Sequence, residues 1–104
     1  MASLSDVVMN PEAQRFELTA GGATAFAEYG LRNGDMLLPH TLVPEAMGGQ
    51  GIGGLLAQAA LGYAREHGLK VKPTCSFMAG YITKHPEWRD VVHPHYRARL
   101  GLPD

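Results

Sequence analysis

The feature that most limits the possible folds is a glycine-rich segment at residues 43–54. It joins a strand pattern ending at Val43 to a helical pattern ending at His67. Five of its twelve residues are glycine. Glycine accepts positive φ and lets the backbone approach a ligand closely, so a glycine-rich loop that opens a helix directs several free N–H groups to one point. The helix dipole adds roughly half a positive charge there, which favours phosphate or pyrophosphate.

Two better-known phosphate loops fit this segment poorly. A P-loop ends in Gly-Lys-Ser/Thr, whereas Gly54 is followed by two leucines, which excludes nucleoside triphosphate hydrolysis of that type. Gly49, Gly51 and Gly54 match the Rossmann spacing, but that motif opens a parallel fold, and antiparallel strand patterns come first here. A flexible turn without a ligand is the remaining alternative.

Length and charge indicate one small domain without a nucleic-acid partner. The 104 residues are 45% apolar, which is enough for one modest core. We expect a single domain over residues 1–104, with the core at residues 7–92 and a C-terminal tail at residues 93–104. Nine basic and ten acidic side chains give a net charge of −1, which offers nucleic acid no basic surface.

The single cysteine, Cys75, cannot form an internal disulfide. The sequence shows neither a secretory apolar region nor a run of about 18 apolar residues. We therefore expect a cytoplasmic protein with no membrane partner, and we favour a monomer.

The N-terminal half has the pattern of antiparallel strands. Short β-forming runs predict strands at residues 7–9, 15–19, 23–29 and 36–43. Gly21-Gly22 is a turn signal, and Asn33-Gly34 predicts a tight hairpin between the last two strands. In residues 23–29, alternation sets Phe26 on one face and Ala25, Ala27 and Tyr29 on the other. Pro39 indicates a bulge or an interrupted ladder.

A helical period follows the glycines and ends at a clear stop signal. The apolar face predicted to pack on the sheet is Ile52, Leu55, Leu56, Ala59, Ala60 and Tyr63. Gly68 suits the left-handed residue after the helix. Residues 69–72 then predict a strand parallel to residues 36–43.

A second helix is predicted to run to about Lys84. Thr74 or Ser76 would cap it, and Pro86 would end it. Phe77, Met78 and Ile82 are interpreted as core residues of this helix.

This order of elements gives an α+β fold with a mixed sheet, in which antiparallel strands precede a β-α-β-α unit. Five motifs accompany this order: His40-Thr41-Leu42-Val43-Pro44, Gly49-Gln50-Gly51-Ile52-Gly53, Ala64-Arg65-Glu66-His67-Gly68-Leu69-Lys70-Val71, Pro73-Thr74-Cys75-Ser76-Phe77 and His85-Pro86-Glu87-Trp88. With them, residues 15–92 resemble the GNAT superfamily of N-acetyltransferases, specifically its smallest, single-domain branch.

The resemblance implies that acetyl-CoA binds between two strands that splay apart, with its pyrophosphate at the glycine loop. The implied cofactor-binding residues are Leu42, Val43, Met47, Gly48, Gly49, Gln50, Gly51, Ile52, Gly53, Gly54, Tyr81 and Lys84. Gly48 stands where the family signature has Arg or Gln, so one side-chain contact is missing. We expect binding to survive, because main-chain amides carry the phosphate recognition.

Cys75 and His40 are the candidate catalytic residues. Cys75 falls at the expected start of the second helix, where the dipole favours thiolate, and an acetyl-cysteine would split the transfer into two steps. The alternative is a small buried hydrophobe. His40 is of a residue type that can act as a general base on the incoming amine. The alternative is a strand histidine whose ring is hydrogen-bonded to a neighbouring carbonyl. Tyr81 would either protonate the departing CoA thiolate or serve only as a packing residue of the second helix.

His85, His93 and His95 do not make a zinc pattern, because no cysteine or carboxylate at ligand spacing accompanies them, and we expect no metal.

Three functions remain open from the sequence. The leading one is an acetyl-CoA-dependent N-acetyltransferase acting on an amine, either a protein lysine, an N-terminus or a small amine. The second is an acyl-CoA-binding module without turnover, and the third is an interaction domain without a cofactor. The short turn at Gly21-Gly22 leaves no room for the acceptor-pocket helices of larger family members, so an open site is expected.

Overall fold

The computed structural model describes residues 2–102. One mixed sheet holds five strands in sequence order: β1 (Val8–Asn10), β2 (Arg15–Ala20), β3 (Ala23–Arg32), β4 (Asp35–Leu42) and β5 (Lys70–Lys72). All neighbours are antiparallel except β4 and β5, which are parallel. The helices are α1 (Ile52–Glu66), α2 (Ser76–Lys84) and α3 (Pro94–Leu100). Short 3₁₀ turns, which the sequence did not predict, lie at Leu4–Asp6, Glu45–Met47 and Pro86–Val91.

The strands and hairpins of the N-terminal half are confirmed. Asn33 and Gly34 both have positive φ, as a tight two-residue hairpin requires. The interruption at Pro39 is confirmed as well: Glu28 pairs with His40 while Gly30 pairs with Leu37. Two residues of β4 therefore oppose one residue of β3, which is the definition of a bulge.

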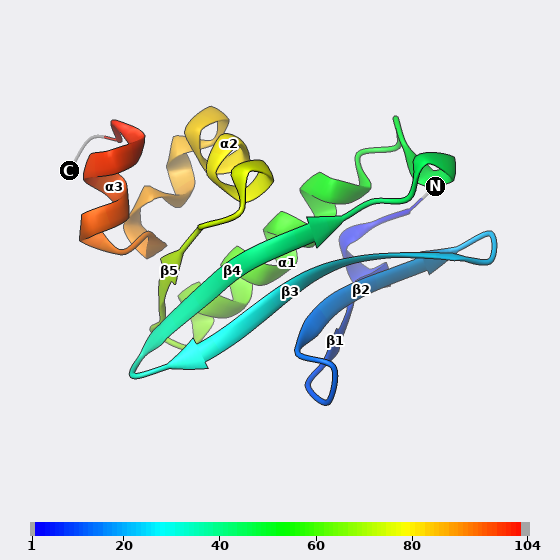
Figure 1. Cartoon of the computed structure of the whole chain (residues 1–104), viewed down its shortest axis with the longest axis horizontal. Coiled ribbons are helices and arrows are strands. Elements are labelled where there is room, and N and C mark those ends of the chain that lie inside the picture. The colour runs from blue at the N-terminus through cyan, green and yellow to red at the C-terminus, as the bar shows by residue number, and fades with distance from the viewer. Residues whose placement is uncertain (1, 103–104) are drawn as a thin grey trace.

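Figure 1 shows α1 lying across one face of the sheet, with α2 and α3 gathered beyond β5. The sheet residues beneath α1 are buried: Phe16, Leu18, Ala25, Ala27, Tyr29, Met36 and Leu38. The alternation predicted for residues 23–29 is confirmed, since Phe26 lies on the other face and is only half-buried. The sheet is therefore apolar on one side and open on the other.

Helix α1 is flanked by left-handed glycines: Gly51 (φ 71°) is its N-cap residue, and Gly68 (φ 65°) follows the C-cap residue His67. Its buried residues are Ile52, Gly53, Leu56, Ala57, Ala60, Leu61 and Ala64. Leu55, Ala59 and Tyr63 of the predicted face pack against the core but are only half-buried, and the prediction missed Ala57, Leu61 and Ala64. The buried stripe is shifted because α1 packs against α2 and the 3₁₀ turn at Pro86–Val91 as well as the sheet.

Helix α2 starts one residue after Cys75 and ends before Pro86, as predicted. The predicted cap was wrong: Cys75 itself is the N-cap residue, and no side chain caps the helix. The Cys75 N–H instead donates to the Leu38 carbonyl of β4 (3.0 Å), which fixes the start of α2 against the sheet.

The C-terminal segment corrects another prediction. Residues 93–102 are not a free tail, because Pro94–Leu100 forms α3, and Tyr96, Leu100 and Leu102 pack against the core. The segment is anchored by the His93 N–H, which donates to Val71 of β5 (2.8 Å). The last two residues of the expected tail lie outside the described residues.

Candidate functional site

Strands β4 and β5 pair over only three residues and then separate. The paired residues are Asp35, Met36 and Leu37 of β4, opposite Lys70, Val71 and Lys72 of β5. Beyond the bulge, no strand among residues 2–102 pairs with the β5-side edge of β4 at residues 39–42. The splayed strand pair expected from the sequence is confirmed, and Cys75 follows directly on the departing strand.

The glycine loop presents a row of free amides beside this opening. Within the described part of the chain, the N–H groups of residues 49–54 donate to no protein acceptor. The first internal bond of α1 is from Leu55 N–H to the Gly51 carbonyl (3.2 Å). Six consecutive amides at the positive end of a 15-residue helix thus have no internal acceptor; Ile52 and Gly53 are buried, whereas residues 49–51 are exposed to an incoming anion.

Two of the predicted loop residues differ from the rest. The Met47 N–H donates to the Pro44 carbonyl (2.8 Å), and the Gly48 N–H donates to the Glu45 carbonyl (3.0 Å). The Met47 side chain is buried in the core. The amides of Met47 and Gly48 are thus already paired in a 3₁₀ turn and are not available to a phosphate. The N–H groups without an internal acceptor are those of residues 49–54, which we call the amide cradle.

Helix α2 packs closely on the N-terminal turn of α1. A Cβ placed on Gly53 would lie 2.6 Å from the Phe77 ring, and one placed on Gly54 would lie 3.6 Å from the Tyr81 ring. Phe77 is 41% exposed, so its interpretation as a core residue was wrong, whereas Met78 and Ile82 are buried as expected. Glycine at position 53 lets the aromatic ring of Phe77 reach the edge of the amide cradle.

Tyr81 and Lys84 lie together on the outer side of α2. With Ser76, Phe77 and Gly80 they line a cavity of about 230 Å³. The Tyr81 ring stacks on His85 at 4.3 Å between centroids. Tyr81 therefore lies beside Gly54 of the glycine loop, and Lys84 lines the same cavity as Tyr81.

The Cys75 sulfur lies at the N-terminus of α2 and faces β4. Its thiol donates to the Thr41 hydroxyl over 3.6 Å between Sγ and Oγ1. Burial raises the pKa of the Cys75 thiol, but hydrogen bonds from the Met78 N–H, the Thr41 hydroxyl and the N–H groups of Phe77 and Thr41 outweigh burial, so the pKa is held below its usual value. This environment favours a nucleophilic thiolate.

His40 lies on the other side of β4 from Cys75. It pairs across the sheet with Glu28, whereas its neighbour Thr41 pairs with the buried Ala27 on the α1 side. The His40 ring is exposed and contacts the edge of Phe26, with 6.0 Å between centroids. The two candidate catalytic residues thus flank one strand edge from opposite faces and do not touch each other.

Thr41 is the site residue that the sequence did not reveal. Its hydroxyl reaches a sulfur 34 residues away in sequence. No local pattern carries this contact, because it depends on the bulge in β4 and on the Cys75–Leu38 hydrogen bond. The only sequence signal for Thr41 was the strand alternation beyond Pro39, which sets its side chain on the opposite face of β4 from His40.

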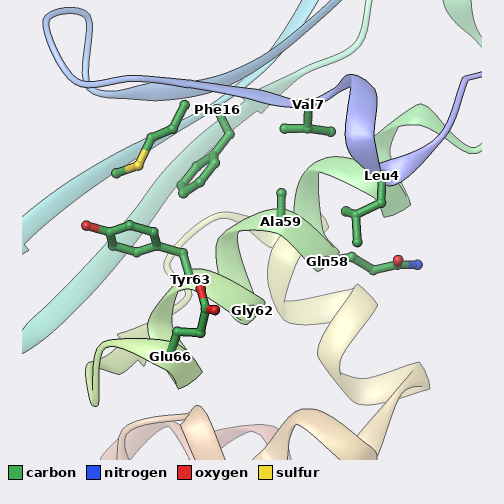
Figure 2. A pocket seen from close by; sticks show the side chains of 9 residues that line it. Leu4, Val7, Phe16, Gln58, Ala59, Gly62, Tyr63 and Glu66 are labelled. Atoms are coloured by element: carbon green, nitrogen blue, oxygen red, sulfur yellow. The ribbon is translucent and has the colours of Figure 1, made fainter.

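A larger cavity, of about 430 Å³, lies elsewhere (Figure 2). It sits between the N-terminal segment and the outer side of α1, and it is lined by Leu4, Val7, Met9, Phe16, Gln58, Ala59, Gly62, Tyr63 and Glu66. None of these residues comes from β4, β5, α2 or the glycine loop. It is therefore separate from the opening between β4 and β5.

Residues 2–102 contain neither a metal-binding cluster nor a membrane-spanning helix. No group of three His, Cys, Asp or Glu side chains there is arranged to hold a metal ion. His85 lies 3.5 Å from Glu87, and His93 accepts a hydrogen bond from the His95 N–H. Within the same range, no helix has the length and apolar character needed to cross a bilayer.

Comparisons with known proteins agree with this geometry. Residues 15–91 match the family model of the GCN5-related N-acetyltransferases. Protein NATD1 of Homo sapiens is 43% identical over 63 residues, which cover 61% of this chain and 50% of that protein, and NATD1 of Danio rerio is 36% identical over the same length. The chain thus spans about half the length of these curated relatives.

A solved structure is also similar over nearly the whole domain. The solution structure of a GCN5-like protein from Staphylococcus aureus superposes with a TM-score of 0.69 at 28% identity, covering 88% of this chain and 91% of that one. The matching fold, the strand separation and the family model over most of the sequence lead to one assignment. The chain belongs to the GCN5-related N-acetyltransferase family of acyltransferases.

Proposed function

We propose that this chain transfers the acetyl group of acetyl-CoA to a primary amine, in a reducing compartment such as the cytoplasm. The observation that carries the proposal is the row of free amides at residues 49–54 beside the gap between β4 and β5. These amides would bind the pyrophosphate of the substrate. Leu42 and Val43 border the gap where the pantetheine arm would lie, and the Tyr81–Lys84 side of α2 suits the adenosine 3′-phosphate.

Cys75 is proposed as the nucleophile. Its thiolate attacks the thioester carbonyl, the bond between the acetyl carbon and the CoA sulfur breaks, and CoA leaves as a thiolate that takes up a proton. The amine then attacks the acetyl-cysteine, and the Cys75 sulfur leaves. The hydrogen-bond donors around Cys75 support this role because they stabilise the sulfur anion both before attack and on departure.

His40 is proposed as the base that takes the amine proton. It is exposed on the open face of the sheet, whereas Cys75 lies on the other side of β4. This division suits two successive steps, because the acyl donor and the acceptor would approach the same strand edge from different faces. A direct attack of the amine on the thioester would use His40 in the same way, without acetylation of Cys75.

Intact-mass spectrometry after incubation with acetyl-CoA tests the covalent route. The wild-type chain is expected to gain the mass of one acetyl group, and the Cys75→Ala variant is expected to gain none and to lose turnover. Because Cys75 is the only cysteine, the variant removes a single thiol. Undiminished turnover by Cys75→Ala would assign the reaction to direct attack.

A binding module without turnover is the second candidate, favoured by Gly48 and by the open acceptor side. A thermal shift with CoA separates the candidates. The transferase and the module both predict a raised melting temperature, but only the transferase predicts that an amine accelerates thioester loss above background. An unchanged melting temperature would contradict both and favour an interaction domain.

A further inference from the structure

The larger cavity, shown in Figure 2, has the size and lining of a small-molecule site. Its volume of about 430 Å³ falls within the range of about 300–1,000 Å³ that such sites usually have. Most of its walls are aliphatic or aromatic side chains, from Leu4, Val7, Met9, Phe16, Ala59 and Tyr63. Among its described lining residues, Glu66 alone is charged. An apolar space with one anionic group suits an apolar molecule that carries one positive charge.

Contacts within the chain hold these walls in position. The Leu4–Asp6 turn packs against α1, and β1 pairs with β2 along its whole length. The Tyr63 ring lies edge-on to Phe16 with 6.0 Å between centroids, and it stacks on His67 at 3.9 Å. A ligand would therefore enter a space whose walls are already ordered, so binding avoids the free-energy cost of ordering them.

Glu66 provides the anionic group at the rim of the cavity. It is exposed, and its carboxylate forms no hydrogen bond or ion pair with another described residue. The neighbouring Arg65 does not neutralise it, because the Arg65 guanidinium pairs with Asp90. Glu66 lies three residues after Tyr63 in α1, so both side chains lie on the same helix face. A cation at this rim would contact a carboxylate and an aromatic ring, both of which attract positive charge.

The polar groups of the lining favour one kind of cation. A primary ammonium has three N–H groups, and burying any of them without an acceptor costs free energy. Besides Glu66, the described lining side chains offer two oxygen acceptors, the Gln58 amide and the Tyr63 hydroxyl. Figure 2 shows these groups in separate parts of the lining, so they do not converge on one nitrogen. A quaternary ammonium needs no acceptor and binds well to aromatic rings.

We propose that this cavity binds a small molecule in which an aromatic or branched hydrocarbon group carries a quaternary ammonium. The hydrocarbon group lies among Leu4, Val7 and Ala59, and the ammonium lies at the rim beside Tyr63 and Glu66. The inference goes beyond the proposed acetyl transfer and is independent of it, because none of the described lining residues comes from β4, β5, α2 or the glycine loop. A quaternary nitrogen has no N–H to exchange for an acetyl group, so the molecule is a ligand and not an acceptor.

Titration of the full chain with benzyltrimethylammonium, followed by nuclear magnetic resonance without CoA, tests the site. Saturable binding is expected with a Kd below about 1 mM. The ring signals of Phe16 and Tyr63 are expected to shift, with nuclear Overhauser contacts from the N-methyl protons to Tyr63. The neutral alcohol 2-methyl-1-phenylpropan-2-ol has nearly the same shape, and it is expected to bind about 3-fold more weakly or worse. Benzylammonium, which brings three N–H groups, is also expected to bind more weakly than the quaternary probe.

Glu66→Gln is expected to weaken binding of benzyltrimethylammonium by about 3- to 10-fold and to leave binding of the alcohol unchanged, which separates lost charge from altered shape. The matched control is Glu12→Gln, because Glu12 is exposed in the turn between β1 and β2 and is not among the described lining residues. It is expected to bind within about two-fold of wild type. Ala59→Leu fills part of the cavity and is expected to weaken binding of both compounds by about 10-fold or more.

Three outcomes would overturn the site: no saturable shift, shifts confined to β4 and β5, or wild-type affinity in Glu66→Gln. Equal binding of benzyltrimethylammonium and the alcohol would overturn the cationic ligand. Equal or tighter binding of benzylammonium would overturn the quaternary class. Since the titration contains neither CoA nor an acetyl group, its result is separate from that of the mass-spectrometric test of acetyl transfer.

Discussion

At the scale of single residues, the environment of Cys75 is assembled from two distant parts of the chain. The start of α2 supplies backbone donors from Phe77 and Met78, and β4 supplies the hydroxyl and the N–H of Thr41. These donors outweigh the burial that would otherwise raise the pKa of the thiol. The reactivity of Cys75 therefore depends on a strand residue as much as on the helix that carries it.

Thr41→Val is expected to raise the pKa of Cys75, because it removes one donor to the thiolate and keeps the side-chain shape. The rate of alkylation by iodoacetamide, measured against pH, gives this pKa from its midpoint. The control is Thr83→Val, since the Thr83 hydroxyl donates to the Ala79 carbonyl away from the sulfur. An unchanged midpoint in Thr41→Val would show that the backbone donors alone lower the pKa.

The sequence could place Cys75 but not its partner. Pro73 ends a strand pattern and the helical period begins soon after it, so the start of α2 was predictable from local signals. Thr41 was not, because its approach to the sulfur depends on how a bulge in β4 aligns with a loop more than 30 residues away. The same limit applies to Met47 and Gly48, whose amides are used in a short 3₁₀ turn that no sequence signal announced.

At the scale of elements, α1 uses glycine for different purposes along its length. Gly51 begins the helix with a left-handed φ of 71°, and Gly53 makes room for the Phe77 ring. Gly62 does neither: it lies inside the helix, and a Cβ placed there would meet nothing within 4 Å. The first two glycines are required by the site, whereas the third only adds chain entropy to the unfolded state.

Gly62→Ala is therefore expected to stabilise the protein by about 0.5–1 kcal/mol. Urea unfolding followed by circular dichroism measures this free energy. Gly51→Ala is the comparison, and it is expected to cost about 1–2 kcal/mol, because its side chain would be held in the left-handed region. A change of the same sign in both variants would contradict the separate roles given to these glycines.

At the scale of the whole molecule, one sheet organises the binding groups. The hairpins and the left-handed glycine after α1 were predictable because each has a local signal. The parallel pairing of β5 was predictable because a helix connects it to β4. The helix α3 and the bond from His93 to Val71 were not, since a basic segment without a strong apolar period resembles a tail. The bond from His93 to Val71 holds β5 at the edge turned away from β4. The edge of β4 beyond its three paired residues stays unpaired among the described residues and faces the gap.

CoA is expected to slow hydrogen exchange in several segments at once. The amides of residues 49–54 have no internal acceptor, so phosphate oxygens would protect them strongly. The segment around Cys75 should be protected as well, while the hairpin of β2 and β3 should not change. Mass spectrometry of deuterated peptides measures the exchange of each of these segments. Pantetheine, which lacks the pyrophosphate, is expected to leave residues 49–54 unprotected, and equal protection by the two ligands would contradict the amide cradle.

The solitary thiol at the start of α2 also makes the chain its own spectroscopic reporter. A maleimide fluorophore would attach at one atom without any engineering, because no other cysteine competes. The dye would then sit beside the opening in the sheet, where its emission would respond to each ligand that enters or leaves.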